Sequence, residues 1–343
     1  MLRLLAVGLG QSGRHWVAGM LPQVPEVELA GCVDVDPAAL HLVVEHAGVP
    51  EERCFTLLGD ALAATDADAV LVATNLPGHV PVARNALEAG RHVLVEKPFA
   101  ATPAEAAEVV TLAERRRLVL MVNQNYRFFP AARAAAELVR AGGLGEPHEV
   151  EVDFRHEPVS EPGTGHRLLE QPLLLDMAVH HADLLRFVLG REATAVTCEA
   201  WNPSWSGFAG PPAAVATVRF GDSVVASYRG SWIGWGQATA WAGEWRMAFE
   251  AGEAWWTSRR SMYDSGADRL VVRERGAEPR EVELPRLELI DRAGCLAEFA
   301  AAVSTGRTPE TSGRDNLATL SLCEALVKSA RRRIPVTPAE VPD

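Results

Sequence analysis

The chain has 343 residues, of which 48% are hydrophobic and 23% are charged, and its formal net charge is −12 at pH 7. This length exceeds what one hydrophobic core usually supports, so we expect two domains. An acidic chain has little attraction for phosphate backbones, and no run approaches the roughly 20 apolar residues of a membrane helix. The sequence therefore predicts neither nucleic acid nor a membrane as a partner.

Cysteine usage is typical of a reducing compartment. The five cysteines are scattered and include no C-x-x-C pair, unlike a disulfide framework or a zinc site. Disulfides are rare in cytosolic proteins. We therefore expect a cytoplasmic protein without a bound metal.

The first part of the chain alternates short apolar runs with helical patterns. Strands are predicted at residues 4–7, 27–33, 69–73, 92–95 and 119–122, with helices between them. Because these strands are apolar throughout, they fit a parallel sheet that is covered on both faces. The alternation of strand and helix predicts a doubly wound α/β Rossmann domain.

The pattern changes after about residue 127. Helical patterns at 131–140 and 173–189 flank a strand at 149–154. Further strands are predicted at 194–200, 214–220, 224–232, 245–249 and 270–273, and two helices at 289–304 and 315–331 end the chain. This predicts an α+β domain with a large open mixed or antiparallel sheet. We expect domains at 1–125 and 126–343, with the C-terminal helices either in the second domain or packed back on the first.

The first predicted turn carries a dinucleotide-binding pattern, G-x-G-x-x-G, between a strand and a helix. The first glycine permits a tight turn, the second lets the backbone approach a pyrophosphate, and the third allows close packing of helix on strand. The pyrophosphate then lies at the helix N-terminus, where free N–H groups favour anions. The predicted contacts are Gly8, Gly10, Gln11, Ser12 and Gly13.

Asp34 ends the second predicted strand about twenty residues further on. A carboxylate there can accept hydrogen bonds from a ribose 2′-hydroxyl, and it repels a 2′-phosphate. The sequence therefore favours NAD over NADP. Arg14 is close enough in sequence to meet a phosphate, which keeps NADP open.

Two further clusters are candidates for chemistry. Lys97, in the run Glu96-Lys97-Pro98, follows a strand of the sheet, where ligands of open α/β folds bind. A lysine there can stabilise alkoxide charge as a hydride leaves, although an exposed lysine is the plainer interpretation. Asp176, His180 and Asp183 have the i, i+4, i+7 spacing of one helix face. A histidine beside a carboxylate suits proton transfer, and a metal site or a structural network are the alternatives.

Together these motifs resemble the Gfo/Idh/MocA oxidoreductases, in order and in spacing over nearly the whole chain. The resemblance implies that His180 is the general acid/base, that Lys97 binds and polarises the reacting oxygen, and that Asp176 orients the substrate or His180. It also implies positions near the cofactor for Thr74, Asn75, His79 and Glu96, and positions over the substrate pocket for Tyr126 and Arg127. His181 does not match the base position, and we place it in the pocket as a supporting residue.

The function implied by the resemblance is NAD(P)-dependent hydride transfer to or from a hydroxyl or ketone carbon of a sugar, sugar acid or cyclitol. The second domain would bind the substrate and form a homodimer or homotetramer. Two alternatives stay open: an enzyme whose tightly held NAD cycles internally, as in glycosidase- or epimerase-like reactions, and a non-catalytic NAD-binding sensor. Residues 170–175 replace a glycine run common in the family, which leaves the substrate undefined.

Tryptophan is concentrated in the second half of the chain, where all but Trp16 of the nine lie beyond residue 200. Strands accept aromatic residues readily, and aromatic residues are enriched at subunit interfaces. We expect most of these rings to pack on the sheet or in an interface. The alternative is that some stack on a substrate ring.

Overall fold

The computed structural model describes residues 1–158, 160–161, 163, 165–260 and 265–340. The chain forms two compact units, Met1–Asn125 with Arg292–Leu317 and Tyr126–Asp291 with Ala318–Asp343. Residues 292–317 belong to the first unit although they follow most of the second unit in sequence. The chain therefore passes from the first unit to the second, back to the first, and again to the second.

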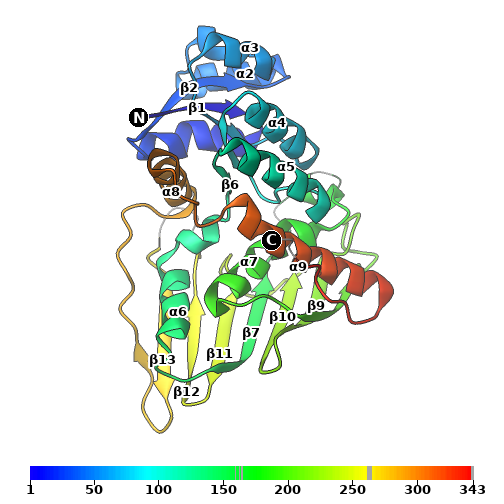
Figure 1. Cartoon of the computed structure of the whole chain (residues 1–343). Helices are drawn as coiled ribbons and strands as arrows, with labels where there is room; N and C mark the ends of the chain where they lie inside the picture. The colour runs from blue at the N-terminus through cyan, green and yellow to red at the C-terminus, as the bar shows by residue number, and fades with distance from the viewer. Residues whose placement is uncertain (159, 162, 164, 261–264, 341–343) are drawn as a thin grey trace. The chain divides into compact units, whose positions relative to one another are not determined.

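The first unit is built on a six-stranded parallel sheet with the order β3-β2-β1-β4-β5-β6 (Figure 1). The strands are β1 (Leu2–Val7), β2 (Val27–Val33), β3 (Cys54–Phe55), β4 (Ala69–Val72), β5 (His92–Val95) and β6 (Leu120–Val122). The order reverses direction between β1 and β4, which is the switch point where doubly wound folds bind ligands. The predicted Rossmann fold is confirmed.

The helices of the first unit follow the predicted alternation. Between the strands lie α1 (Gln11–His15), α2 (Pro37–Ala47), α3 (Leu58–Ala64), α4 (Leu76–Glu88) and α5 (Pro103–Arg116). The helix α8 (Asp291–Thr305), predicted near the end of the chain, belongs to this unit from Arg292 onward. A π-helical turn, Trp16–Met20, continues α1. The short elements β3 and α3 were not predicted, because two residues and seven residues give little periodicity to recognise.

Two of the three motif glycines are required by local packing. Gly8 has φ +89°, and a Cβ there would lie 2.5 Å from the backbone nitrogen of Thr74. A Cβ on Gly13 would lie 1.8 Å from the carbonyl oxygen of Gly8. Gly10 differs, because a Cβ there would meet nothing within 4 Å. The turn therefore needs Gly8 and Gly13 to fold, whereas Gly10 leaves open space in front of α1.

The second unit is built on an eight-stranded sheet with the order β14-β13-β12-β11-β7-β10-β9-β8. The strands are β7 (Pro147–Arg155), β8 (Ala195–Trp201), β9 (Ala213–Phe220), β10 (Val224–Ser231), β11 (Glu244–Phe249), β12 (Gly252–Thr257), β13 (Arg269–Glu274) and β14 (Arg280–Glu281). The pair β7–β10 is parallel and the other pairs are antiparallel. This confirms the predicted mixed sheet, although β12 and β14 were not predicted.

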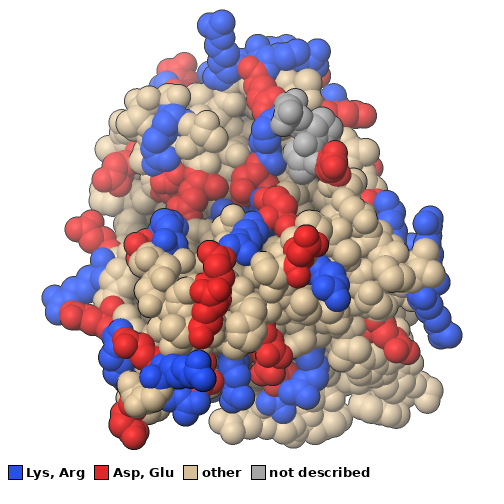
Figure 2. Space-filling model, turned by 60° about the horizontal axis from the view of Figure 1, so that its bottom comes forward, with Lys and Arg blue, Asp and Glu red and all other residues tan. Residues whose placement is uncertain are grey.

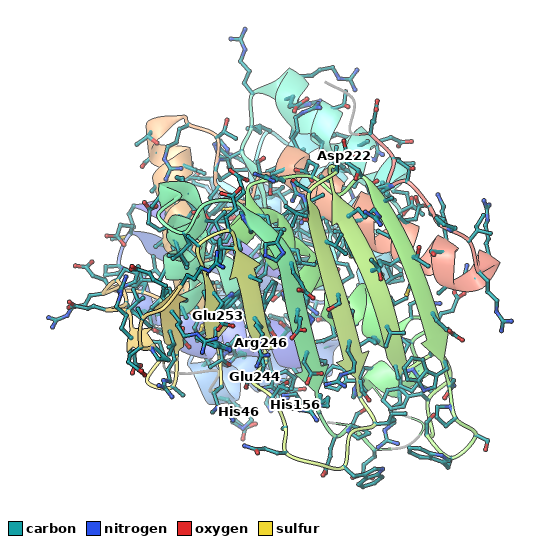
Figure 3. All side chains as sticks on the ribbon, turned by 90° about the horizontal axis from the view of Figure 1, so that it is seen from below. His46, His156, Asp222, Glu244, Arg246 and Glu253 are labelled. Atoms are coloured by element: carbon teal, nitrogen blue, oxygen red, sulfur yellow. The ribbon has the colours of Figure 1, made fainter. Side chains whose placement is uncertain are left out.

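Helices cover one face of this sheet. Figure 1 shows α6 (Pro130–Ala141), α7 (Ala178–Leu189) and α9 (Gly313–Arg332) on that face. Figure 3 shows the opposite face, where side chains project from the strands and no helix lies in front of them. Along β9, buried and exposed residues alternate over most of the strand, as expected for a sheet with one face on the core and one open.

Six of the tryptophans beyond residue 200 fall into two groups by the exposure of their side chains. Trp232, Trp245 and Trp256 are buried, and the rings of Trp245 and Trp256 stack at a centroid distance of 4.5 Å. These three fit the packing interpretation. Trp201, Trp205 and Trp235 are instead 42%, 61% and 75% exposed, so packing on the sheet does not explain them. Among the described helices, none is both long enough and apolar enough to cross a membrane.

The glycine turn yields a matched pair of variants. Gly13→Ala should lower the free energy of unfolding by more than about 2 kcal/mol, because its Cβ overlaps the Gly8 carbonyl. Gly10→Ala should stay within about 1 kcal/mol of the parent, since Gly10 has φ −58° and open surroundings. Urea unfolding followed by circular dichroism measures both. Equal effects of the two substitutions would contradict this account of the turn.

Candidate functional site

A buried carboxylate, Glu96, joins three parts of the first unit at the end of β5. Its Oε1 accepts hydrogen bonds from Ser12 Oγ at 3.1 Å and Trp16 Nε1 at 2.8 Å. Arg292, at the start of α8, places its Nε 3.4 Å from the same oxygen. The other oxygen, Oε2, accepts the backbone N–H of Lys97 at 3.2 Å. The glycine-loop helix, the Lys97 loop and α8 therefore meet at one carboxylate.

Electrostatics keeps Glu96 ionised. Burial raises the pKa of this carboxyl, but the charge of Arg292, the hydrogen bond from Trp16 and the charge of Lys97 together outweigh it. The resulting pKa is about 2. Glu96 thus carries a full negative charge at neutral pH and attracts the cations around it.

Lys97 is partly buried and follows Glu96 directly. The next peptide bond, Lys97–Pro98, is cis. The imidazole of His79 contacts the Pro98 carbonyl oxygen through Nδ1 at 2.8 Å and the Thr74 carbonyl oxygen through Nε2 at 3.1 Å. Burial lowers the pKa of His79 by more than these carbonyls raise it. His79 therefore links the loop after β4, which includes Asn75, to the loop that carries Lys97.

Asp34, at the end of β2, lies beside the glycine loop. Its Oδ2 accepts the backbone N–H of Leu9 at 2.5 Å, and its Oδ1 accepts that of Asp36 at 2.9 Å. The guanidinium of Arg14 donates to the Leu9 carbonyl oxygen at 2.7 Å. The carboxylate is thus held next to Gly8 and Gly10, while Arg14 is engaged with the loop backbone. Gln11 and Ser12 begin α1, whose N-terminus has no side-chain cap.

In the second unit, His180 lies in the first turn of α7 and is 5% exposed. Its imidazole stacks on the ring of Tyr126, with centroids 3.9 Å apart and planes 2° from parallel. Asp176 is in a π-helical turn, Pro172–Met177, that precedes α7. The single regular helix predicted over residues 173–189 is therefore wrong in its first part, and the i, i+4 argument for one face does not apply to Asp176.

Asp183 and Arg127 form a buried ion pair. Arg127 donates from Nε to Asp183 Oδ2 at 2.7 Å and from Nη2 to Oδ1 at 2.6 Å. Thr319 Oγ1 donates to the same carboxylate at 3.0 Å. The hydrogen-bond partners of the Asp183 carboxylate in the described part of the chain are thus an arginine and a threonine, not the histidine that a His–Asp network would require. The pair fastens the segment after Asn125 to α7.

His181 lies in the interior of the second unit and is fully buried. Its Nδ1 lies 3.2 Å from the hydroxyl of Tyr228, and its Nε2 lies 3.0 Å from the carbonyl oxygen of Trp241. Burial lowers the pKa of His181 to about 4, so the imidazole is neutral at pH 7. A neutral ring that donates from Nε2 and accepts at Nδ1 satisfies both contacts.

Three residues at these places were not predicted from the sequence: Trp16, Arg292 and His166. Trp16 and Arg292 hold Glu96, and nothing in their local sequence marks that role. His166 was also missed: burial lowers its pKa while the charge of Asp176 raises it, and its Nδ1 lies 2.9 Å from Ser160 Oγ. Across the described residues, no group of three or more His, Cys, Asp and Glu side chains is arranged to hold a metal ion.

A parallel sheet with a glycine turn at its switch point is the architecture of dinucleotide-binding domains, and here an open mixed sheet follows it. Comparison with known proteins makes this specific. The model of the oxidoreductase family with an NAD-binding Rossmann fold, Gfo/Idh/MocA, matches residues 2–124, and that of the Gfo/Idh/MocA C-terminal domain matches residues 132–253. The chain belongs to the Gfo/Idh/MocA family and is an NAD(P)-binding oxidoreductase.

Individual relatives agree with this assignment. The chain is 30% identical over 317 residues to the D-apiose dehydrogenase of Paraburkholderia graminis, covering 89% of this chain and 81% of that protein. It is 27% identical over 330 residues to the 1,5-anhydro-D-fructose reductase of Ensifer adhaerens, covering 94% and 95%. The aldose-aldose oxidoreductase of Caulobacter crescentus has the same fold, with a TM-score of 0.86 at 22% identity over 98% of this chain and 99% of that one.

Glu96 leads to a test by pH. Its folded pKa of about 2 lies below the value of about 4.3 in an unfolded chain, so ionised Glu96 stabilises the fold above pH 5, and this stabilisation is lost as the pH falls towards 2. Glu96→Gln should lower the free energy of unfolding at pH 7 by about 3 kcal/mol. The difference from the parent should shrink as the pH falls.

Urea unfolding at a series of pH values measures this difference. Glu114→Gln is the control, because Glu114 pairs with Arg314 at the surface, where ion pairs contribute less than about 1 kcal/mol. A Glu96→Gln variant as stable as the parent at pH 7 would show that the carboxylate is not the anchor described here.

Proposed function

We propose that this chain is an NAD-dependent dehydrogenase or reductase that transfers a hydride between the nicotinamide and a hydroxyl or ketone carbon of a sugar, sugar acid or cyclitol. The observation that carries the proposal is the open space at Gly10 in front of an α-helix N-terminus without a side-chain cap. A dinucleotide pyrophosphate needs such an approach to free N–H groups. The names of the relatives from P. graminis and E. adhaerens support sugar-like substrates.

The residues present fit NAD better than NADP. Gln11, Ser12 and Gly13 lie at the start of α1, where backbone N–H groups would donate to the pyrophosphate of a bound dinucleotide. The carboxylate of Asp34, held beside the loop, suits a ribose 2′-hydroxyl and repels a 2′-phosphate. Arg14, the cation that could accept such a phosphate, donates instead to the Leu9 carbonyl.

When bound, NAD supplies the carbon that accepts or gives the hydride, and the chain supplies the proton chemistry. In this proposal His180 removes the proton of the substrate hydroxyl during oxidation and returns it during reduction. The ammonium of Lys97 stabilises the developing alkoxide, and Asp176 orients the substrate or His180. Thr74, Asn75, His79 and Glu96 shape the cofactor side, and Tyr126, Arg127 and His181 support the substrate side.

We also propose that the open face of the eight-stranded sheet forms the interface of a homodimer or homotetramer. Figures 2 and 3 show acidic and basic side chains intermingled on this face, and Figure 3 labels Glu244, Arg246 and Glu253. Asp153, for example, pairs with Arg229 at 2.9 Å. A face that carries both charges can complement a second copy of itself.

The five free cysteines support a cytoplasmic location.

Turnover by the parent and by site variants tests the reaction. The panel is D-apiose, D-xylose, D-glucose, D-gluconate and myo-inositol with NAD, and 1,5-anhydro-D-fructose with NADH, followed by absorbance of NADH. Lys97→Ala and His180→Ala should each lower kcat by at least about a hundredfold, because each removes a group that acts on the reacting oxygen or its proton. Lys328→Ala and His148→Ala are matched controls at exposed positions and should keep parental rates.

Two outcomes would change the proposal. Parental activity in either Lys97→Ala or His180→Ala would remove that residue from the mechanism. Substrate conversion without accumulation of free NADH would favour the enzyme whose held cofactor cycles internally, and NAD binding without any conversion would favour the sensor.

The cofactor assignment has its own test. Asp34→Asn keeps an acceptor oxygen for the loop but removes the charge, so the preference for NAD over NADP in kcat/KM should fall by about tenfold or more. Asp36→Ser is the control, since it removes a charge two residues away and keeps an oxygen that can accept the Ala38 N–H at the start of α2. If Asp34→Asn leaves the preference unchanged, Asp34 does not select the cofactor.

A further inference from the structure

The ring of Tyr126 lies parallel to the imidazole of His180. The two rings lie 3.9 Å apart and are parallel to within 2°, and Tyr126 is 3% exposed. The terminal torsion of a histidine side chain is broad when nothing packs on it. A parallel ring at van der Waals distance restricts that torsion, because rotation of the imidazole would break the stack.

Tyr126 is itself held at its far end by Arg259. The guanidinium Nη1 donates to the phenol oxygen at 2.7 Å, and its central carbon lies 4.5 Å from the centre of the Tyr126 ring. Burial lowers the pKa of Arg259, but Tyr126 and Asp291 raise it by more. Arg259 therefore stays charged in the interior and keeps both its hydrogen bond and its cation–π contact.

The backbone at Arg259 is held in a conformation that residues other than glycine rarely adopt. Its φ is +60°, and the φ of its ion-pair partner Asp291 is +56°. Such conformations are unfavourable for residues that carry a Cβ, and they persist where the surroundings impose them. Here the carboxylate of Asp268 accepts the N–H of Arg259 at 2.9 Å, and the Arg259 carbonyl accepts the N–H of Trp241 at 3.1 Å.

We propose that Tyr126 and Arg259 are positioning residues for the reaction: Arg259 fixes the phenol ring, and the phenol ring fixes the imidazole of His180 in the orientation that proton transfer needs. This inference rests on the proposed function, in which His180 is the acid/base. Catalytic groups must be held within about 0.5 Å and 10–20° of the productive geometry. The stack favours one orientation of the imidazole on the phenol ring, and the cation–π contact favours one position of the phenol ring against Arg259.

The test separates the ring from its hydroxyl. Tyr126→Leu removes the stack and should lower kcat about tenfold to a hundredfold, with KM changed less than about threefold. Tyr126→Phe keeps the ring and should recover most of the lost kcat. Trp256→Leu is the matched control, because it breaks the stack with Trp245 in the same unit without touching His180, and its kcat should equal that of the parent below the unfolding temperature.

A double-mutant cycle with His180 decides whether Tyr126 acts by positioning His180 or whether its loss loosens the second unit in general. If Tyr126 acts through His180, then Tyr126→Leu should lower kcat no further in a His180→Ala background. Additive losses, or a parental kcat in Tyr126→Leu, would overturn the inference. If instead His180→Ala retains parental activity, the proposed function fails first, which distinguishes the two failures.

Two further measurements cover variants that do not fold and panels that show no turnover. Arg259→Met with Asp291→Asn removes both charges of the ion pair together and should lower kcat by about threefold to tenfold, because Tyr126 is then held less tightly.

NMR of the histidine ring protons is the second measurement. The chain has ten histidines, and the signals of His180 are identified by their loss in His180→Gln. These signals should be shifted upfield by the Tyr126 ring. They should move downfield in Tyr126→Leu. Unchanged His180 signals would show that Tyr126 does not define the orientation of the ring.

Discussion

The first unit depends on keeping one carboxylate charged in its interior. Glu96 is 6% exposed, and desolvation alone would neutralise it. Arg292, Trp16 and the Lys97 loop prevent this, and in doing so they tie α8, the glycine-loop helix and the end of β5 to one point. Breaking a buried pair leaves an uncompensated charge, which costs several kcal/mol. The glycine loop and the Lys97 loop are thus both positioned by their contacts with the Glu96 carboxylate.

The second unit uses a different constraint for a similar purpose. Tyr126 and Arg127 are adjacent in sequence, yet one stacks on His180 and the other forms a bidentate pair with Asp183, three residues further along α7. The short segment that begins this unit is therefore fastened to the helix carrying His180 at two points. Each unit of the chain thereby holds its own chemical group, Lys97 in one and His180 in the other, by buried polar contacts.

Much of this arrangement could be predicted from the sequence, and the features that were not predicted were missed for physical reasons. Local signals identified the parallel strands, the glycine turn and Asp34, because glycine spacing and apolar runs are short-range features. The π-helical turn before α7 was missed, since a 3.6-residue period cannot reveal an extra residue in one turn. Arg292 and Arg259 were missed because their partners, Glu96 and Tyr126, are more than a hundred residues away. The roles of Lys97, Asp176 and His180 came from family resemblance and remain predictions.

The central claim, that the chain moves a hydride between a sugar-like substrate and NAD, is tested most directly by following the hydride itself. The parent enzyme is incubated with NAD and fully deuterated sugars and is then denatured. The mass of the recovered cofactor is measured by mass spectrometry. The account predicts reduced cofactor that carries one deuterium, formed at least about a hundredfold more slowly with His180→Ala. Cofactor that binds but never acquires deuterium from any sugar, sugar acid or cyclitol would contradict it.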